Sequence, residues 1–197
     1  MNGCKFYITF TKMKIKPLPD LNYLKECFEI DETLPCGLRW KSDRPISHFS
    51  TYSGYETWFK ICAGKQCQGK SGKAKYYCVE ILKARFFNHR IIYALHNNTT
   101  DLGNKIIDHI DGNKLNNKPS NLRLVTMLEN ALNTKIHKDN KTGYKNISFN
   151  KKNKKYVCSI QTSGKSSFIG AFDSLEEAVE KRNLKIKELN IEHHRIA

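Results

Sequence analysis

The chain has 197 residues, enough for one ordinary domain or two small ones. Apolar residues make up 39%, which excludes wholesale disorder, and no window has the length that a bilayer-spanning helix needs. Lys and Arg outnumber Asp and Glu 34 to 19. The resulting net charge of +15 favours a polyanionic partner such as nucleic acid, with a merely soluble basic surface as the alternative.

The seven cysteines form an odd set without a CxxC pair, and the N-terminus has no apolar stretch typical of a signal peptide. A reducing, cytoplasmic location is expected, which is the bacterial host cytoplasm if a phage encodes the chain. Cys62 and Cys67 near His48 allow a zinc-site interpretation, but the spacing is loose. Buried free thiols are the favoured interpretation.

The N-terminal part is predicted to contain an extension followed by a helix. Residues 1–19 are interpreted as the extension, which ends at a Pro-Leu-Pro-Asp sequence. We expect the first twelve residues to be dispensable, because Met13 offers an alternative start. Asp20 is a predicted N-cap for a helix with Leu21, Leu24 and Phe28 on one face.

The middle of the chain changes from turns to regular elements. Residues 38–72 are rich in aromatic side chains and glycines, which predicts turns. The alternating pattern over 75–85 predicts one strand of a hairpin, and 88–96 has the apolar spacing of a short helix.

A strand–loop–strand–helix pattern comes next. Residues 105–109 and 122–125 are predicted strands separated by a polar loop. Thr126 and Glu129 have the spacing of a capping box, so a helix should begin directly after Thr126. Asn130 then lies one turn inside that helix.

The C-terminal part is predicted to form a separate small domain. Its predicted strands are 146–149, 156–161 and 167–170, and a capping box at Ser174 and Glu177 predicts the helix that follows. The expected fold class is therefore α+β. The predicted organisation is an extension at 1–19, a larger domain at 20–134 with its core at about 105–134, a linker at 135–143 and a small domain at 144–190.

Three residues of the strand–loop–strand–helix segment suit phosphodiester hydrolysis. That reaction needs a base for water and a cation beside the phosphate. Asp108 and His109 are adjacent at a strand end, so one can hold a metal while the other addresses water. Asn130 returns on the next helix, where its amide oxygen could complete the site. Mg²⁺ prefers such oxygen ligands and keeps several waters.

The segments 107–117 (IDHIDGNKLNN), 121–126 (NLRLVT) and 129–130 (EN) resemble the ββα-metal motif of HNH endonucleases, closest to the phage and intron homing type. The resemblance implies that Asp108 and Asn130 hold Mg²⁺ or Mn²⁺, and that His109 is the general base. It also implies that Asn121 braces the loop and orients His109. The run 88–91 (NHRI) resembles the His-Arg that opens the preceding helix in such proteins, where packing or a phosphate contact is the expected role.

The C-terminal domain resembles the Apetala/ethylene-response-factor type of DNA-binding domain in residues 144–147 (YKNI), 156–160 (YVCSI), 168–173 (FIGAFD) and 176–178 (EEA). The resemblance implies a three-stranded sheet in the major groove, braced by a helix. Side chains at corresponding positions would face DNA: Lys145, Ser148, Asn150, Tyr156, Ser159 and Gln161. Plant members use arginines at positions that are Lys, Ser, Asn or Gln here, so the target sequence does not follow.

Four lysines at the predicted hairpin tip are candidates for phosphate contacts, namely Lys151, Lys152, Lys154 and Lys155. The alternative is that this tip is only a solvated turn.

The leading hypothesis is a homing-type endonuclease that nicks or cleaves double-stranded DNA, without membrane association or an obligate protein partner. A single motif predicts nicking by a monomer. A DNA-binding regulator with a degenerate nuclease module is the alternative, although Asp108, His109 and Asn130 are all retained. A restriction or toxin nuclease would use the same chemistry in another biological role.

Overall fold

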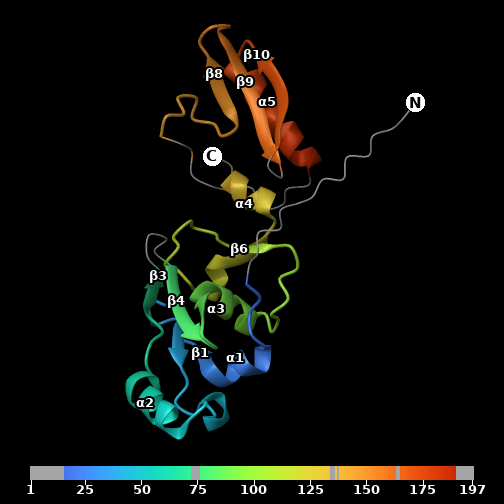
Figure 1. Cartoon of the computed structure of the whole chain (residues 1–197). Helices are drawn as coiled ribbons and strands as arrows, with labels where there is room; N and C mark the ends of the chain where they lie inside the picture. The colour runs from blue at the N-terminus through green and yellow to red at the C-terminus, as the bar shows by residue number, and fades with distance from the viewer. Residues whose placement is uncertain (1–15, 72–75, 134–135, 137, 163–164, 190–197) are drawn as a thin grey trace, which may run out of the picture. The chain divides into compact units, whose positions relative to one another are not determined.

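The computed structural model describes residues 16–71, 76–133, 136, 138–162 and 165–189. The chain divides into two compact units, an N-terminal unit (Pro17–Thr126) and a C-terminal unit from Met127 onward. Figure 1 shows the elements of both units and labels many of them. The hypothesis about residues 1–12 lies outside the described residues.

The N-terminal unit combines short helices with three small antiparallel sheets. Its helices are α1 (Leu21–Cys27), η1 (Ile46–His48), α2 (Tyr52–Cys62), α3 (Asn88–His96) and η2 (Pro119–Asn121). Its strands are β1 (Phe28–Ile30), β2 (Leu38–Trp40), β3 (Gly69–Ser71), β4 (Tyr76–Ile81), β5 (Ala84–Phe87), β6 (Ile106–His109) and β7 (Leu122–Val125).

The core of this unit forms around α3 because the apolar face of that helix is completely buried. Ile91, Ile92 and Ala94 are fully buried on α3 and belong to one cluster with Leu24 of α1 and Leu38 of β2. The side chain of Asp20 caps α1 by accepting hydrogen bonds from the amides of the first turn, as the sequence predicted. The predicted helix at 88–96 is also confirmed.

Strands β6 and β7 form the predicted antiparallel hairpin. Ile106 pairs with Val125, and His109 pairs with Leu122 at the loop end of the ladder. The intervening residues therefore leave the sheet at His109 and return at Leu122, which places the polar loop directly beside Asp108 and His109.

The C-terminal unit contains α4 (Met127–Asn133), β8 (Ile147–Asn150), β9 (Lys155–Thr162), β10 (Lys165–Phe172) and α5 (Leu175–Glu188). The strands form an antiparallel sheet with β9 in the centre, and α5 packs against one face of it. The hydroxyl of Ser174 accepts from the amide of Glu177, as expected for the predicted cap. The predicted α+β class, with a small three-stranded sheet and one packed helix, is confirmed.

Side chains alternate between the two faces of this sheet. Cys158 and Ile160 on β9 are buried on the helix-covered face, and Ile147 opposite Cys158 lies with them. Ser148 and Ser159 therefore point to the other face, which we call the outer face of the sheet. Phe168 pairs with Ser159 on this outer face and is 68% exposed.

Several elements differ from expectation. Phe28, predicted on one face of the first helix, begins β1, and the strand predicted at 75–85 is interrupted after Ile81 and forms the hairpin of β4 and β5. The segment predicted as turns contains α2, whose glycine, serine and aromatic residues have weak helix propensity, and its N-cap Thr51 accepts from the amide of Gly54. The helix α4, predicted as the end of the larger domain, packs its Leu132 with Ile160 and Ile186 of the C-terminal unit. The predicted boundary at residue 134 stays a prediction.

The cysteines of the described part are all free thiols, and most are buried. No group of three or more His, Cys, Asp or Glu side chains suited to hold a metal occurs among the described residues, so the zinc interpretation has no cluster to rest on. In the same ranges, every helix falls short of the length or apolar character that crossing a membrane would require.

Candidate functional site

Asp108 and His109 occupy the last two positions of β6 and are both largely removed from solvent. The carboxylate of Asp108 accepts two hydrogen bonds from Arg123, at 2.9 Å from Nη2 and 3.2 Å from Nε. These residues are directly opposite each other in the hairpin, so the strand register itself creates the ion pair. The guanidinium fixes the position of the Asp108 carboxylate at the strand end.

His109 is held by a side chain from the loop. Its Nε2 lies 3.1 Å from Oδ1 of Asn117, and both side chains are buried. The amide nitrogen of Asn117 donates to the carbonyl oxygen of Cys36 at 3.1 Å. His109 is therefore linked through Asn117 to the turn before β2.

Asn121 organises the loop between β6 and β7. Its amide nitrogen donates to the carboxylate of Asp111 and to the carbonyl of Asn116, and its Oδ1 accepts from the amide of Asp111. The main-chain carbonyl of Asn121 also accepts from Ile110. The hydrogen bonds of the Asn121 side chain therefore reach the loop, whereas the Asn117 side chain contacts the His109 ring. A catalytic part for Asn121 stays a prediction.

The same loop bonds act on the carboxyl group of Asp111. Partial burial by itself would raise the pKa of Asp111, but hydrogen bonds from Asn116, the Asn113 amide and Asn121 outweigh it and lower the pKa. Asp111 is therefore a structural anion of the loop, bound to loop donors.

Asn130 lies on α4 in the other unit and is partly buried. Its place beside Asp108 stays a prediction. The donor set of a carboxylate and an amide oxygen fits Mg²⁺ or Mn²⁺, because these cations take oxygen ligands and complete their coordination with water. A structural zinc ion would need several His or Cys ligands close together, and the described residues contain no group of three or more such side chains.

His89 is buried against His109 in a box of aromatic rings. The two imidazoles meet edge to face with centroids 5.1 Å apart, and the ring of Phe87 stacks on His89 at 5.6 Å. Tyr76 contacts both imidazoles, and the ammonium of Lys114 lies over its ring at 5.1 Å. The Nδ1 atom of His89 is buried and has no hydrogen-bond partner among the described residues. Its observed role is therefore packing against His109, one of the two roles expected from the sequence.

Burial, followed by the fields of His109 and Arg90, lowers the pKa of His89 to about 3 from its ordinary value of 6.5. Between these two values the unfolded chain binds a proton that the folded chain does not, so acid favours unfolding. We expect the free energy of unfolding to fall by about 2 kcal/mol between about pH 6.5 and pH 5 through this residue alone. Urea titrations across this range measure it.

His89→Phe should flatten this pH dependence, because no proton can bind at the position in either state. His96→Gln is the matched control, since His96 is exposed at the end of the same helix. An unchanged slope in His89→Phe would contradict the assignment.

The tip between β8 and β9 carries the basic residues expected from the sequence. Lys151, Lys152 and Lys154 are exposed, whereas the ammonium of Lys155 lies 2.9 Å from the carboxylate of Asp173. The side chain of Asn150 accepts hydrogen bonds from the amides of residues 152 and 153 and so shapes the turn. The exposed charge of the tip is therefore carried by three lysines.

Two residues predicted to face DNA lie elsewhere. The ammonium of Lys145 donates to the carbonyl of Leu132 at 2.7 Å, which satisfies the C-terminal end of α4. Tyr156 lies two residues before Cys158 on β9 and therefore on the same, helix-covered face, where it packs into the cluster beneath α5. Gln161 belongs to β9, and its side chain is outside the described part. Ser148 and Ser159 do lie on the outer face.

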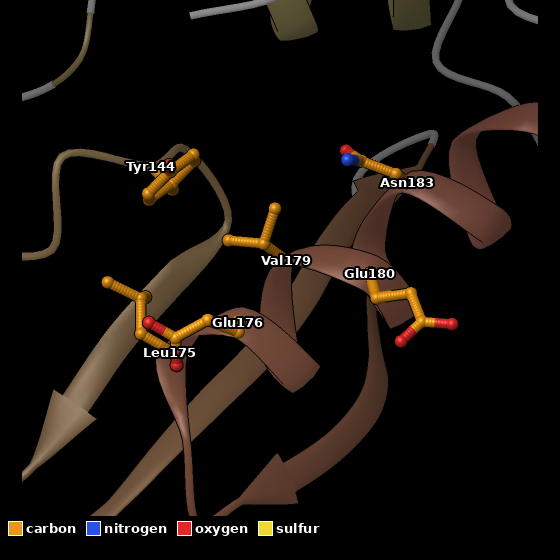
Figure 2. Close-up of a pocket in the computed structure, with 6 residues that line it drawn as sticks. All are labelled: Tyr144, Leu175, Glu176, Val179, Glu180 and Asn183. Carbon is orange, nitrogen blue, oxygen red and sulfur yellow. The ribbon is translucent and has the colours of Figure 1, made fainter.

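The helix-covered side of this unit has a pocket of about 420 Å³, shown in Figure 2. Its lining residues come from α5 and the loop before β8, namely Tyr144, Leu175, Glu176, Val179, Glu180 and Asn183. The charged residues of this lining are both acidic, so the pocket does not suit a phosphate. Three exposed lysines lie at the β8–β9 tip instead, outside this lining.

Sequence reasoning missed the contact between Asn117 and His109. Asn117 is one of three asparagines of this loop, with Asn113 and Asn116, and each has the same local signal of a turn-forming residue. Asn117 differs from the other two asparagines through its hydrogen bond to Cys36, which is 81 residues away in the chain. His89 could be noticed in the sequence from its position at the start of a predicted helix. That position does not predict the contact between its ring and the ring of His109.

Comparisons with known proteins relate the segment that carries these residues to a known family. The model of the HNH endonuclease family matches residues 86–132, which span α3, the hairpin and most of α4. A protein of Acanthamoeba polyphaga mimivirus, described as an uncharacterized HNH endonuclease, is 35% identical over 134 residues, covering 68% of this chain and 67% of that protein. Protein 3.8 of Escherichia phage T7 is 40% identical over 70 residues, or 36% of this chain, and the matched part spans 58% of that protein. No solved structure matches.

A hairpin ending in Asp-His, a loop braced by asparagines and a helix next in the sequence are the elements of a ββα-type nuclease motif in their chain order. The chain belongs to the HNH endonuclease family.

Proposed function

We propose that the protein is a metal-dependent, homing-type endonuclease that hydrolyses phosphodiester bonds of double-stranded DNA. The observation that carries the proposal is the placement of His109 beside Asp108 at the end of β6, within the segment that matches the HNH family. In this proposal His109 removes a proton from the attacking water, and the products carry 5′-phosphate and 3′-hydroxyl ends.

Asp108 and Asn130 would hold a single Mg²⁺ or Mn²⁺ ion. When bound, such an ion supplies positive charge beside the scissile phosphate and the departing 3′ oxygen. Arg123 keeps the Asp108 carboxylate at the strand end through its two hydrogen bonds. Asn121 keeps the loop in the conformation that brings Asn117 to His109.

We further propose that the C-terminal unit is an Apetala/ethylene-response-factor-like domain that directs the nuclease to DNA. Support comes from its sheet of three strands with one packed helix and from the exposed lysines at the β8–β9 tip. The outer face, with Ser148, Ser159 and the exposed ring of Phe168, would meet the groove, while the tip would meet phosphates.

A plasmid-nicking assay tests the enzymatic proposal. Supercoiled DNA is expected to become nicked in Mg²⁺ or Mn²⁺, and EDTA should abolish the reaction because Asp108 and Asn130 then hold no cation. Restoring excess Mg²⁺ should restore nicking, which separates metal dependence from damage to the protein. Binding without nicking under all metal conditions would instead favour a DNA-binding regulator with an inactive nuclease module.

A further inference from the structure

The orientation of the Asn117 amide is fixed by the carbonyl of Cys36. That oxygen can only accept, so the group that approaches it at 3.1 Å must be the NH₂ of Asn117. The reversed amide would set two oxygens against each other. The same carbonyl also accepts from Nδ2 of Asn88 at 3.3 Å, and Asn88 donates to Cys67 at 2.8 Å. The acceptor is therefore itself anchored to the start of α3.

This orientation has a consequence for His109. With the NH₂ turned to Cys36, the oxygen of Asn117 faces Nε2 of His109 at 3.1 Å. An amide oxygen cannot donate, so in the neutral imidazole Nε2 must carry the proton. The ring lone pair then belongs to Nδ1.

The packing around the pair allows few other arrangements. Asn117 is 3% exposed and His109 is 4% exposed, so water cannot readily replace either partner. Gly37 lies against Asn117: a Cβ at Gly37 would be 3.1 Å from the Asn117 Cβ and 2.9 Å from Ile92. The positive φ of 71° at Gly37 lets the backbone pass close to the loop without a side chain.

We propose that Asn117 is a positioning residue that holds His109 in the Nε2–H tautomer, so that Nδ1 is the atom that accepts the proton from water. The inference rests on the proposed role of His109 as general base. A histidine in the wrong tautomer presents an N–H where the reaction needs a lone pair, which slows proton transfer while substrate binding continues.

Histidine-selective ¹⁵N NMR of the intact protein tests the tautomer directly, with the His109 signals assigned by their loss in His109→Ala. Wild type is expected to show the proton on Nε2 at a pH at which the ring is neutral. A proton on Nδ1 would overturn the proposal. This measurement does not depend on cleavage, so a failure of the nuclease assignment and a failure of the tautomer are seen separately.

The kinetic test uses Asn117→Ala, for which kcat should fall about 10- to 100-fold while KM for DNA changes little. Asn117→Asp keeps an oxygen for Nε2–H but sets its second oxygen against the Cys36 carbonyl, so its kcat should lie between those of the alanine variant and wild type. Asn113→Ala is the matched control from the same loop, because the Asn113 side chain accepts a hydrogen bond from the amide of Leu115. Thermal unfolding of every variant verifies that it is folded.

Gly37→Ala perturbs the same contact from the other side of the pair. If folded, it should lower kcat and mix the His109 tautomers, because the added methyl group displaces Asn117. Wild-type kcat in folded Asn117→Ala would overturn the proposal, as would equal losses in Asn117→Ala and Asn113→Ala. If neither Asn117→Ala nor Gly37→Ala folds, the His109 tautomer measured by NMR in the wild-type protein decides whether the proposal holds.

Discussion

His109→Ala is expected to abolish DNA cleavage while DNA binding stays within a few-fold of wild type. The variant loses the proposed base, and no other described side chain takes its place, since the neighbouring His89 is buried in the aromatic box. General-base catalysis contributes about 100- to 10,000-fold, so nicking in Mg²⁺ should decrease by at least about 100-fold. Nicking rates on supercoiled plasmid, with affinity measured by fluorescence anisotropy, provide the two readouts.

The matched control for this prediction is His96→Ala, since His96 is exposed at the end of α3. Its nicking rate should equal that of wild type. Full activity in His109→Ala would refute the assignment of the base, and a parallel loss of DNA binding would indicate a binding role for His109 in place of a chemical one.

Replacing Lys151, Lys152 and Lys154 together with alanine should weaken DNA binding about 100-fold at physiological salt. Each phosphate contact releases counterions, so the slope of log affinity against log salt should become less steep by about 3. Lys155 is left intact because it pairs with Asp173. The loss should be similar for all DNA sequences, because phosphate contacts carry affinity without sequence information.

A triple variant of equal charge change, Lys141→Ala with Lys181→Ala and Lys187→Ala, is the control. These lysines are also exposed, but two of them lie on α5 and none is at the β8–β9 tip. An equal loss in both triple variants would indicate a diffuse charge effect, and an unchanged affinity in the tip variant would favour the solvated-turn interpretation.

Around His109, one asparagine contacts the proposed base and a different asparagine braces the loop. Asn121 was expected to do both, and the structure divides the contacts between Asn121, which bonds to the loop, and Asn117, which bonds to the ring. Asp108 is similarly positioned by Arg123 on the paired strand. Asp108 and His109 are thus each held by a second side chain, one from the paired strand and one from the loop.

The sequence by itself determined the elements whose signals are local. Apolar spacing predicted α3, capping residues placed the starts of α1 and α5, and the motif from Ile107 to Asn130 identified the hairpin and the helix after it. These signals suffice because a cap or an amphipathic period involves residues within one or two turns of each other.

The tertiary structure alone decided which side chains meet. The contact of Asn117 with Cys36 spans 81 residues, the ion pair of Asp108 with Arg123 follows from strand register, and α2 forms in a segment of weak helix propensity. Lys145 and Tyr156 lie away from their predicted surface for the same reason. Long-range packing determines which of several locally equivalent side chains makes a given contact. A local sequence pattern therefore cannot predict that contact.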